Sequence, residues 1–284
     1  MQDLNDGYSP VPWQGYTVKQ ATELIEDIAV LHAKFWEHDV LKDKQLNGHN
    51  VIDPVSGKAK FVHSWGRNLK TALADYPGNK KIYTEAMTEK FNPPVSVDAL
   101  DPTIKKLHFD MTEDNVTAFI AAMEKRLTPR PRTLVHSDMR CDNAFQPDDP
   151  QKRVKMIDWQ TYLCAPASQE CLQLLLVMEN CDHSQTPRLI KLLHSEICKH
   201  RPEVAHEYPA DLFYEDVVLM MCVHMFAVLG VLVPVLPVLP KGHPLYDLLG
   251  YCFGTCCANA MAELNAATVL NTFLKDNNIE VSST

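Results

Sequence analysis

The chain has 284 residues, of which 46% are hydrophobic and 22% are charged, a composition typical of a globular protein with a substantial buried core. Its 27 basic and 36 acidic residues give a net charge of −9, which argues against nucleic acid as a main partner because backbone phosphates require a basic surface. Nine cysteines, an odd number, and a polar N-terminus without a signal peptide predict a reducing, cytoplasmic location.

The first predicted elements are an extended lead-in and a long helix. Residues 1 to 16 are expected to be extended, because their prolines disfavour an early helix. A capping box at Thr17-Val-Lys-Gln20 predicts a helix from Thr17 to about Trp36, whose apolar residues recur at helical spacing. His32 lies on the apolar face, where a histidine is most often a satisfied core residue; the alternative is a polar structural role behind the site described below.

The next part of the chain is less regular. Residues 61 to 73 are expected to form a helix, and a further helix is expected to begin at Thr112 and to end with cations in its last turn, where they suit the helix dipole. The basic residues Arg126, Arg130 and Arg132 follow. A phosphate site is one interpretation of this run, but a helix end with a solvated loop is favoured.

A polar loop occupies the centre of the chain. Short strands are predicted at residues 133–135 and 153–157, forming a short β-hairpin that carries the loop His136-Ser-Asp-Met-Arg-Cys-Asp-Asn143. The second strand leads into Asp158. Asp, Asn and Ser are common in turns for backbone reasons alone, but the spacing of this whole set between two apolar strands is far more specific.

The polar residues of this loop match the needs of phosphoryl transfer from ATP. Asp138 can act as the base that accepts the proton of a hydroxyl, provided that it lies within hydrogen-bond reach. Asn143 and Asp158 offer an amide oxygen and a carboxylate, which are suitable ligands for Mg²⁺. Arg140 can contact the transferring phosphate, and His136 is predicted to orient the loop through hydrogen bonds.

The remainder of the chain has a helical pattern. Residues 217 to 229 are expected to form a buried core helix, and a membrane span is disfavoured because three prolines follow within residues 234 to 240. No membrane contact is therefore predicted.

The motif His136-x-Asp-x-Arg-x-Asp-Asn143, together with Ile157-Asp-Trp-Gln160, resembles the catalytic and metal loops of the aminoglycoside phosphotransferase and choline kinase-like superfamily. The closest likeness is to its ecdysteroid kinase-like branch, and it extends to Leu31-His-Ala33 and Phe35-Trp36. The resemblance implies an α+β, mostly helical fold, namely the C-terminal lobe of a protein-kinase-like fold. It also implies the roles already given to Asp138, Arg140, Asn143 and Asp158.

Two positions and the start of the chain depart from the family pattern. Ser137 stands where the family has glycine, and Glu170 stands near the place of a second aspartate. Gln2-Asp-Leu4 resembles the hinge motif Glu-Asp-Leu, which implies that Asp3 and Leu4 lie at the nucleotide and that the N-terminal lobe is absent. The resemblance thus divides the chain into a hinge-like lead-in (1–16) and a large lobe (17–275), and the polar composition of the last residues predicts a flexible tail (276–284).

Two functional hypotheses follow. The first is an ATP- and magnesium-dependent phosphotransferase, a small-molecule kinase that transfers the γ-phosphate to a substrate hydroxyl. The second is a non-catalytic, kinase-like binding protein, with a partner over the exposed face where a small lobe would sit. An incomplete gene model or a splice form of a full enzyme is a third interpretation. The acceptor molecule is not identified by the sequence.

Overall fold

The computed structural model describes residues 7–42, 74–92, 94, 102–159 and 162–281. Within them the protein is α+β and mostly helical, as the sequence predicted. The chain falls into two compact units, a first unit of residues 1–51 and 130–217 and a second unit of residues 52–129 and 218–284. Asp3, Leu4 and the helix expected at residues 61–73 lie outside the described residues.

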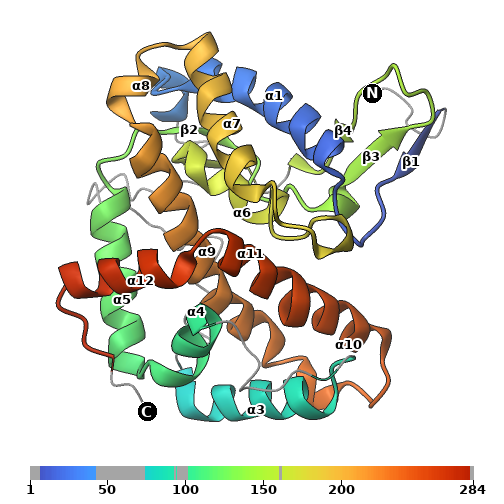
Figure 1. The fold of residues 1–284 in the computed structure, drawn as a ribbon, viewed down its shortest axis with the longest axis vertical. Coiled ribbons are helices and arrows are strands. Elements are labelled where there is room, and N and C mark those ends of the chain that lie inside the picture. The colour runs from blue at the N-terminus through green and yellow to red at the C-terminus, as the bar shows by residue number, and fades with distance from the viewer. Residues whose placement is uncertain (1–6, 43–73, 93, 95–101, 160–161, 282–284) are drawn as a thin grey trace. The chain divides into compact units, whose positions relative to one another are not determined.

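The first unit (Figure 1) contains all five described strands, four described α-helices and the first part of a fifth, α9 (Ala210–Leu232). The five strands and the four complete helices are β1 (Tyr8–Pro10), α1 (Val18–Phe35), β2 (Thr133–Val135), β3 (Ala144–Pro147), β4 (Lys155–Met156), β5 (Leu163–Ala165), α6 (Cys171–Leu174), α7 (Thr186–His200) and α8 (Val204–Glu207).

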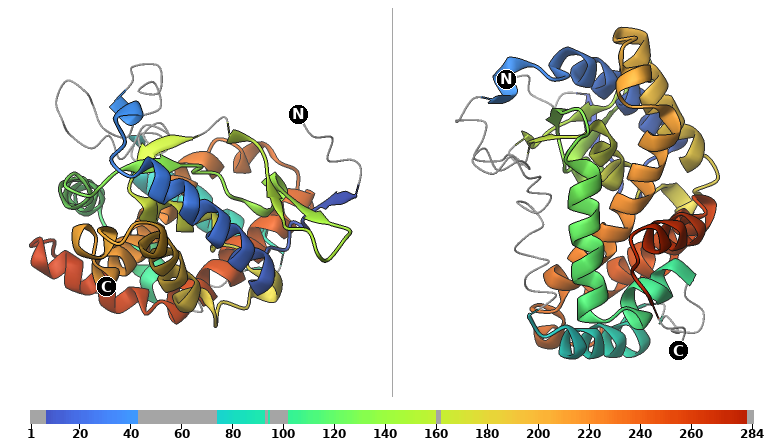
Figure 2. Two further views of the ribbon diagram at one scale, coloured as in Figure 1. Left: turned by 90° about the horizontal axis from the view of Figure 1, so that it is seen from above. Right: turned by 90° about the vertical axis from the view of Figure 1, so that its left-hand side faces the viewer.

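Helix α1 begins where its capping box predicted. The Thr17 side chain accepts a hydrogen bond from Gln20 N at 3.1 Å, and Gln20 Oε1 accepts one from Thr17 N at 2.9 Å. These two bonds satisfy backbone donors that the first turn of a helix leaves unpaired. The apolar face of α1 is buried and packs along α7, which lies beside it in both views of Figure 2.

The strands pair differently from the hairpin that the sequence predicted. β3 pairs with β1 on one side and with β4 on the other, whereas β2 pairs with β5. A short hairpin is therefore present, but its first strand is β3, which the sequence does not predict as a strand. Buried and exposed positions hardly alternate in the four residues of β3, which end in Pro147. The hydrogen-bond partners of β3 lie elsewhere in the chain.

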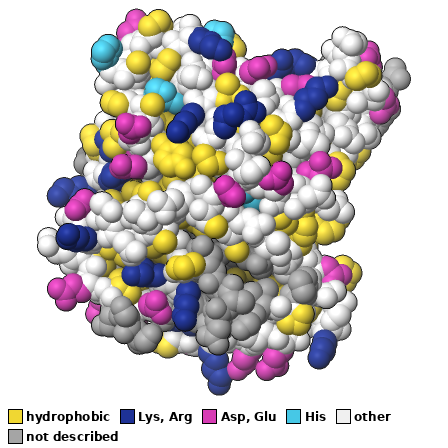
Figure 3. Space-filling view, in the orientation of Figure 1, with side chains coloured by type: hydrophobic (Ala, Val, Ile, Leu, Met, Phe, Trp, Pro, Cys, Tyr) yellow, Lys and Arg dark blue, Asp and Glu magenta, His cyan; other side chains and the backbone are white. Residues whose placement is uncertain are grey.

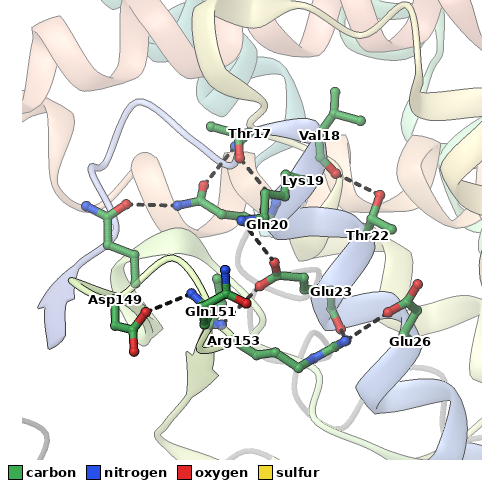
Figure 4. Close-up of polar contacts among 12 residues, drawn as sticks. Thr17, Val18, Lys19, Gln20, Thr22, Glu23, Glu26, Asp149, Gln151 and Arg153 are labelled. Atoms are coloured by element: carbon green, nitrogen blue, oxygen red, sulfur yellow. Dashed lines mark hydrogen bonds and ion pairs between the residues drawn. The ribbon is translucent and has the colours of Figure 1, made fainter. Parts of the chain in front are cut away.

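A charged cluster ties α1 to the β3–β4 hairpin (Figure 4). Arg153 Nη2 donates to Glu23 O at 2.6 Å and to the Glu26 carboxylate at 3.0 Å. Glu23 Oε2 in turn accepts from Val154 N at 3.2 Å. Although exposed ion pairs stabilise little by themselves, these bonds also satisfy backbone groups. They set the position of the hairpin on α1.

The lead-in residues also contact the central loop. Gly15 has φ +115°, and a Cβ atom there would overlap the backbone of Val177 and Met178, so glycine is required. The next residue, Tyr16, is buried and donates from its hydroxyl to Met139 O at 3.1 Å. This bond links the start of the chain to the residue that follows Asp138.

The second unit is helical in its described residues. It contains α3 (Tyr76–Glu89), α4 (Pro102–Lys105), α5 (Glu113–Leu127), α10 (Pro244–Leu249), α11 (Cys257–Glu263), α12 (Ala266–Asp276) and the later part of α9 (Ala210–Leu232).

The observed bounds of these helices agree only in part with the bounds predicted from the sequence. α5 begins after Thr112 as predicted, with a capping box closed by Asn115. α9 contains the predicted core helix and is longer at both ends. Asn115 Nδ2 also donates to Glu280 O at 2.9 Å, so contacts continue past residue 276, where the sequence predicted a flexible tail. Among the described residues no helix has the length and apolar character needed to cross a bilayer.

Two of the three basic residues near residue 130 differ from the prediction of a solvated loop. Arg130 Nε binds Oδ2 of the fully buried Asp216 at 2.7 Å, and Arg132 is only 6% exposed. The prediction failed because their partners lie far away in the sequence. On the face drawn in Figure 3, acidic and basic side chains of the described residues are interspersed, without one continuous basic stripe.

Candidate active site

The central loop connects β2 to β3 and is closed by backbone hydrogen bonds. A short 3₁₀ turn, Cys141–Asn143, begins after Arg140, and Asn143 N donates to Arg140 O at 2.9 Å. Ile157 N then donates to Asn143 O at 2.9 Å. This last bond brings the segment that carries Asp158 against the loop that carries Asp138, although the two are twenty residues apart in the sequence.

Asn143 and Asp138 are joined directly. Asn143 Nδ2 donates to both the backbone oxygen and Oδ2 of Asp138, at 3.0 Å each. Because the amide nitrogen faces Asp138, the amide oxygen faces away from it and makes no hydrogen bond with the described residues. Asn143 is 8% exposed, so this oxygen is held in one orientation. The arrangement leaves a neutral oxygen ligand free for a cation.

His136 is held in a single tautomer. Its Nε2 lies 2.9 Å from Ile157 O, which can only accept, so Nε2 carries the proton. Its Nδ1 accepts from Asp138 N at 3.2 Å. Burial lowers the pKa of His136, although the nearby Asp138 and Asp158 carboxylates act in the opposite direction. The ring is therefore neutral at pH 7, which suits the orienting role that the sequence predicted.

Asp158 lies close to the same histidine. Its carboxylate and that of Asp138 are both near enough to His136 to raise its pKa against the effect of burial. Asp158 has φ +60°, a left-handed conformation that aspartate tolerates better than most residues. Trp159 follows and makes an edge-to-face contact with the His136 ring, with centroids 4.5 Å apart. Asp138, Asn143 and Asp158 are thus gathered around His136 and Ile157.

Arg140 lies at the exposed edge of the loop. Its Nε donates to Asp138 Oδ1 at 2.8 Å, and its Nη1 lies 3.2 Å from Asp142 Oδ2. The side chain is 49% exposed, so these bonds add little stability and can be exchanged for an anion. Arg140 is therefore well placed to contact a phosphate beside Asp138.

Glu170 is a residue whose contacts the sequence did not show. It is fully buried and accepts two hydrogen bonds from the turn, from His136 N at 2.8 Å and from Ser137 N at 3.2 Å. Only the resemblance had pointed to Glu170, as a substitute for a second aspartate. No local pattern shows that a carboxylate from residue 170 reaches the backbone of residues 136 and 137.

Ser137 has φ +64°, where glycine is the residue with least strain. Ser137→Gly should therefore keep stability within about 1 kcal/mol of the wild type, since relief of strain offsets the added freedom of the unfolded chain. Ser137→Val should lower the free energy of unfolding by about 1–2 kcal/mol, because a branched side chain is strained at positive φ. Urea unfolding measures both changes.

Ser195→Val provides the control for Ser137→Val. Ser195 is exposed on α7, where the backbone is helical, so the same substitution should change stability little. Equal urea midpoints for Ser137→Val and the wild type would show that the turn does not impose the strain inferred from its φ.

A cavity of about 250 Å³ opens beside the site within the first unit. Its walls come from one face of α1, from the β4 region and from the two residues that follow the candidate base and metal ligand, Met139 and Trp159. Trp159 is 38% exposed, and Trp13 of the lead-in is 46% exposed. The lining residues are Leu24, Asp27, Ile28, Leu31, Met139, Val154, Lys155, Met156 and Trp159.

The donor set limits which cation the site would hold. No group of three or more His, Cys, Asp or Glu side chains suited to a metal occurs among the described residues. Asn143 and Asp158 offer only oxygen atoms, from one amide and one carboxylate, beside the carboxylate of Asp138. Such a hard, partly open set fits Mg²⁺, which keeps several waters and shares its other ligands with phosphates.

Comparisons with known proteins identify no relative for this chain. No family matches the sequence, and neither a curated protein nor a solved structure matches it.

Proposed function

We propose that the protein is an ATP- and magnesium-dependent phosphotransferase that transfers the γ-phosphate to a hydroxyl of a small molecule, with a protein-kinase-like large lobe as its fold. One observation carries the proposal. Asn143 donates to Asp138 through its side chain and accepts from Ile157 through its backbone, so one residue links the candidate base to the segment of the second carboxylate. Phosphoryl transfer requires such a set of acid, amide and acid.

Each residue has a separate part in the proposed reaction. Asp138 accepts the proton of the acceptor hydroxyl through a carboxylate whose orientation is set by Asn143 Nδ2 and Arg140 Nε. Arg140 moves from Asp138 to the phosphate and offsets the charge that develops there. Asn143 and Asp158 would hold magnesium, which neutralises phosphate oxygens when it is bound. Asp3 and Leu4 remain a sequence-based prediction for the nucleotide contact.

A second candidate function is a kinase-like binding protein without catalysis. It is favoured by the exposure of Trp13 and Trp159, since large exposed apolar side chains often belong to interaction surfaces. Both lie next to the loop, because Cys141 Sγ donates to Trp13 O at 3.5 Å and Trp159 packs on His136. A partner over this face is a prediction of that hypothesis, and a cytoplasmic location is a prediction of both.

Only the phosphotransferase hypothesis predicts transfer of phosphate from ATP to an alcohol. The purified protein should form ADP from ATP when Mg²⁺ and a suitable alcohol are both present, and should transfer labelled γ-phosphate to that alcohol. A library of amino alcohols, aminoglycosides and steroid alcohols covers acceptors of different charge and polarity. Absence of transfer to every member, together with partner capture that depends on Trp13 and Trp159, would favour the binding protein.

A further inference from the structure

Glu170 and His32 form a buried pair behind the candidate site. Both side chains have no solvent exposure, and His32 Nε2 lies 3.6 Å from Glu170 Oε2. His32 comes from α1, whereas Glu170 ends the short 3₁₀ turn Ala167–Glu170. The pair therefore lies between the long helix of the first unit and the turn that leads to Asp138.

The hydrogen bonds of His32 decide which nitrogen carries its proton. His32 Nδ1 lies 3.0 Å from Leu134 O, which can only accept, so Nδ1 is the donor. Burial lowers the pKa of His32 to about 4, so the ring is neutral and Nε2 has a lone pair. Among the described residues Nε2 has no hydrogen-bond partner, and it faces a carboxyl oxygen of Glu170. Two lone pairs in an apolar interior repel unless a proton lies between them.

We propose that Glu170 and His32 hold one proton between them, carried on Glu170 Oε2 with His32 Nε2 as its acceptor. The proton satisfies His32 Nε2, which has no hydrogen-bond partner in the described part of the chain. Glu170 still accepts from His136 N and Ser137 N through its oxygen lone pairs. Only the consequence for turnover rests on the proposed phosphotransferase function.

The proton should leave near neutral pH. Burial raises the pKa of Glu170 from 4.5 to about 7, although the two backbone donors act in the opposite direction. The other titratable groups that face it are His32 from α1, His136 from the turn and Cys171 from α6. Burial keeps both histidines neutral at this pH, and burial together with the Glu170 charge raises the pKa of the Cys171 thiol. Glu170 is therefore the group that titrates.

Ionisation of Glu170 should make the turn at His136 and Ser137 more rigid. Above the pKa of Glu170, its bonds to His136 N and Ser137 N become charge-assisted, and such bonds are roughly twice as strong as neutral ones. His32 Nε2 at the same time loses its donor. The turn should consequently become more rigid as the pH rises from 6 to 8, and this change should appear as slower amide exchange at both residues than base catalysis alone predicts.

Ionisation of Glu170 should lower the stability of the folded protein, although it strengthens the hydrogen bonds of the turn. The pKa of Glu170 is higher in the folded protein than its ordinary value of 4.5, so its stabilising contribution is full below about pH 4.5 and is lost as the pH rises through 7. Between pH 5 and pH 8 the folding equilibrium constant of the wild type should fall by roughly 100-fold relative to that of Glu170→Gln, which cannot ionise.

Nuclear magnetic resonance tests the pair without relying on enzyme activity. The glutamate side-chain ¹³C signals should include one that titrates near pH 7, and Glu170→Gln should remove it. Glu196→Gln is the control, since Glu196 is also buried but pairs with Lys199 on α7, away from the turn. The ¹⁵N signals of His32 should show Nδ1 protonated and Nε2 unprotonated from pH 5 to 8.

The outcomes separate this inference from the proposed function. A His32 ring protonated on both nitrogens below pH 7, or no glutamate titrating near that pH, overturns the inference, and these wild-type measurements need no variant to fold. If turnover is found, kcat of the wild type should rise with the Glu170 titration, while kcat of Glu170→Gln should not. If no turnover is found, the phosphotransferase proposal fails and the shared proton is still decided by the spectra.

Discussion

Replacing Asp138 with asparagine is expected to lower the rate of phosphoryl transfer by about 10²–10⁴-fold while leaving the fold intact. The amide has the shape of the carboxylate, and its oxygen can still accept from Arg140 or Asn143. It cannot accept the proton of the hydroxyl, so the loss should fall on kcat. The rate of γ-phosphate transfer to the best alcohol of the library, at saturating ATP and Mg²⁺, measures the effect.

Asp142→Asn is the matched control for this variant. Asp142 lies four residues further along the loop, is 54% exposed and binds the same Arg140. Its substitution removes one negative charge from the loop and should change kcat by no more than about threefold, since an exposed ion pair contributes little. A fully active Asp138→Asn enzyme would remove Asp138 from the role of base.

Replacing Asp158 with asparagine should weaken magnesium-dependent nucleotide binding by at least about 100-fold, because loss of even an outer partner of a metal site lowers affinity by 10–100-fold. Asparagine is chosen because residue 158 has φ +60°, which asparagine tolerates and alanine does not. Stability should therefore be unchanged, and any loss of affinity should reflect the lost charge. Calorimetry with ATP, with and without Mg²⁺, measures the change.

Comparing ATP binding with and without Mg²⁺ tests whether Asp158 is a metal ligand. Affinity for ATP without Mg²⁺ should be similar in the wild type and in Asp158→Asn, because the carboxylate acts through the cation. Asp142→Asn again controls for the removal of one acidic residue. If Asp158→Asn binds Mg²⁺–ATP as tightly as the wild type does, Asp158 is not a metal ligand.

The helices show what local sequence predicts well. Thr17 and Thr112 each precede a helix, and each makes the reciprocal bonds of a capping box with a residue three positions later. Such bonds close within four residues, so the pattern contains both partners. The start of α1 and α5 was predictable for this reason, as was the buried face of α1, which follows from helical spacing alone.

The residues of the candidate site could be selected from the sequence, but the hydrogen bonds that join them could not. His136, Asp138, Asn143 and Asp158 stood out because their types and spacing suit phosphoryl transfer. The bonds that gather them are backbone bonds between residues far apart in the sequence, above all from Ile157 N to Asn143 O. The left-handed backbone of Ser137 was also hidden, because the residue there is not glycine.

The sequence by itself determined which polar residue types the loop carries and where α1 and α5 begin, since both depend on residues close together in the chain. Only the tertiary structure decided that β2 pairs with β5, that Arg130 meets a buried Asp216, and that Glu170 faces His32 behind the turn. These contacts join residues from 28 to 138 positions apart, by the numbering of the sequence. Burial changes the protonation of such groups, and burial arises only when distant segments pack together.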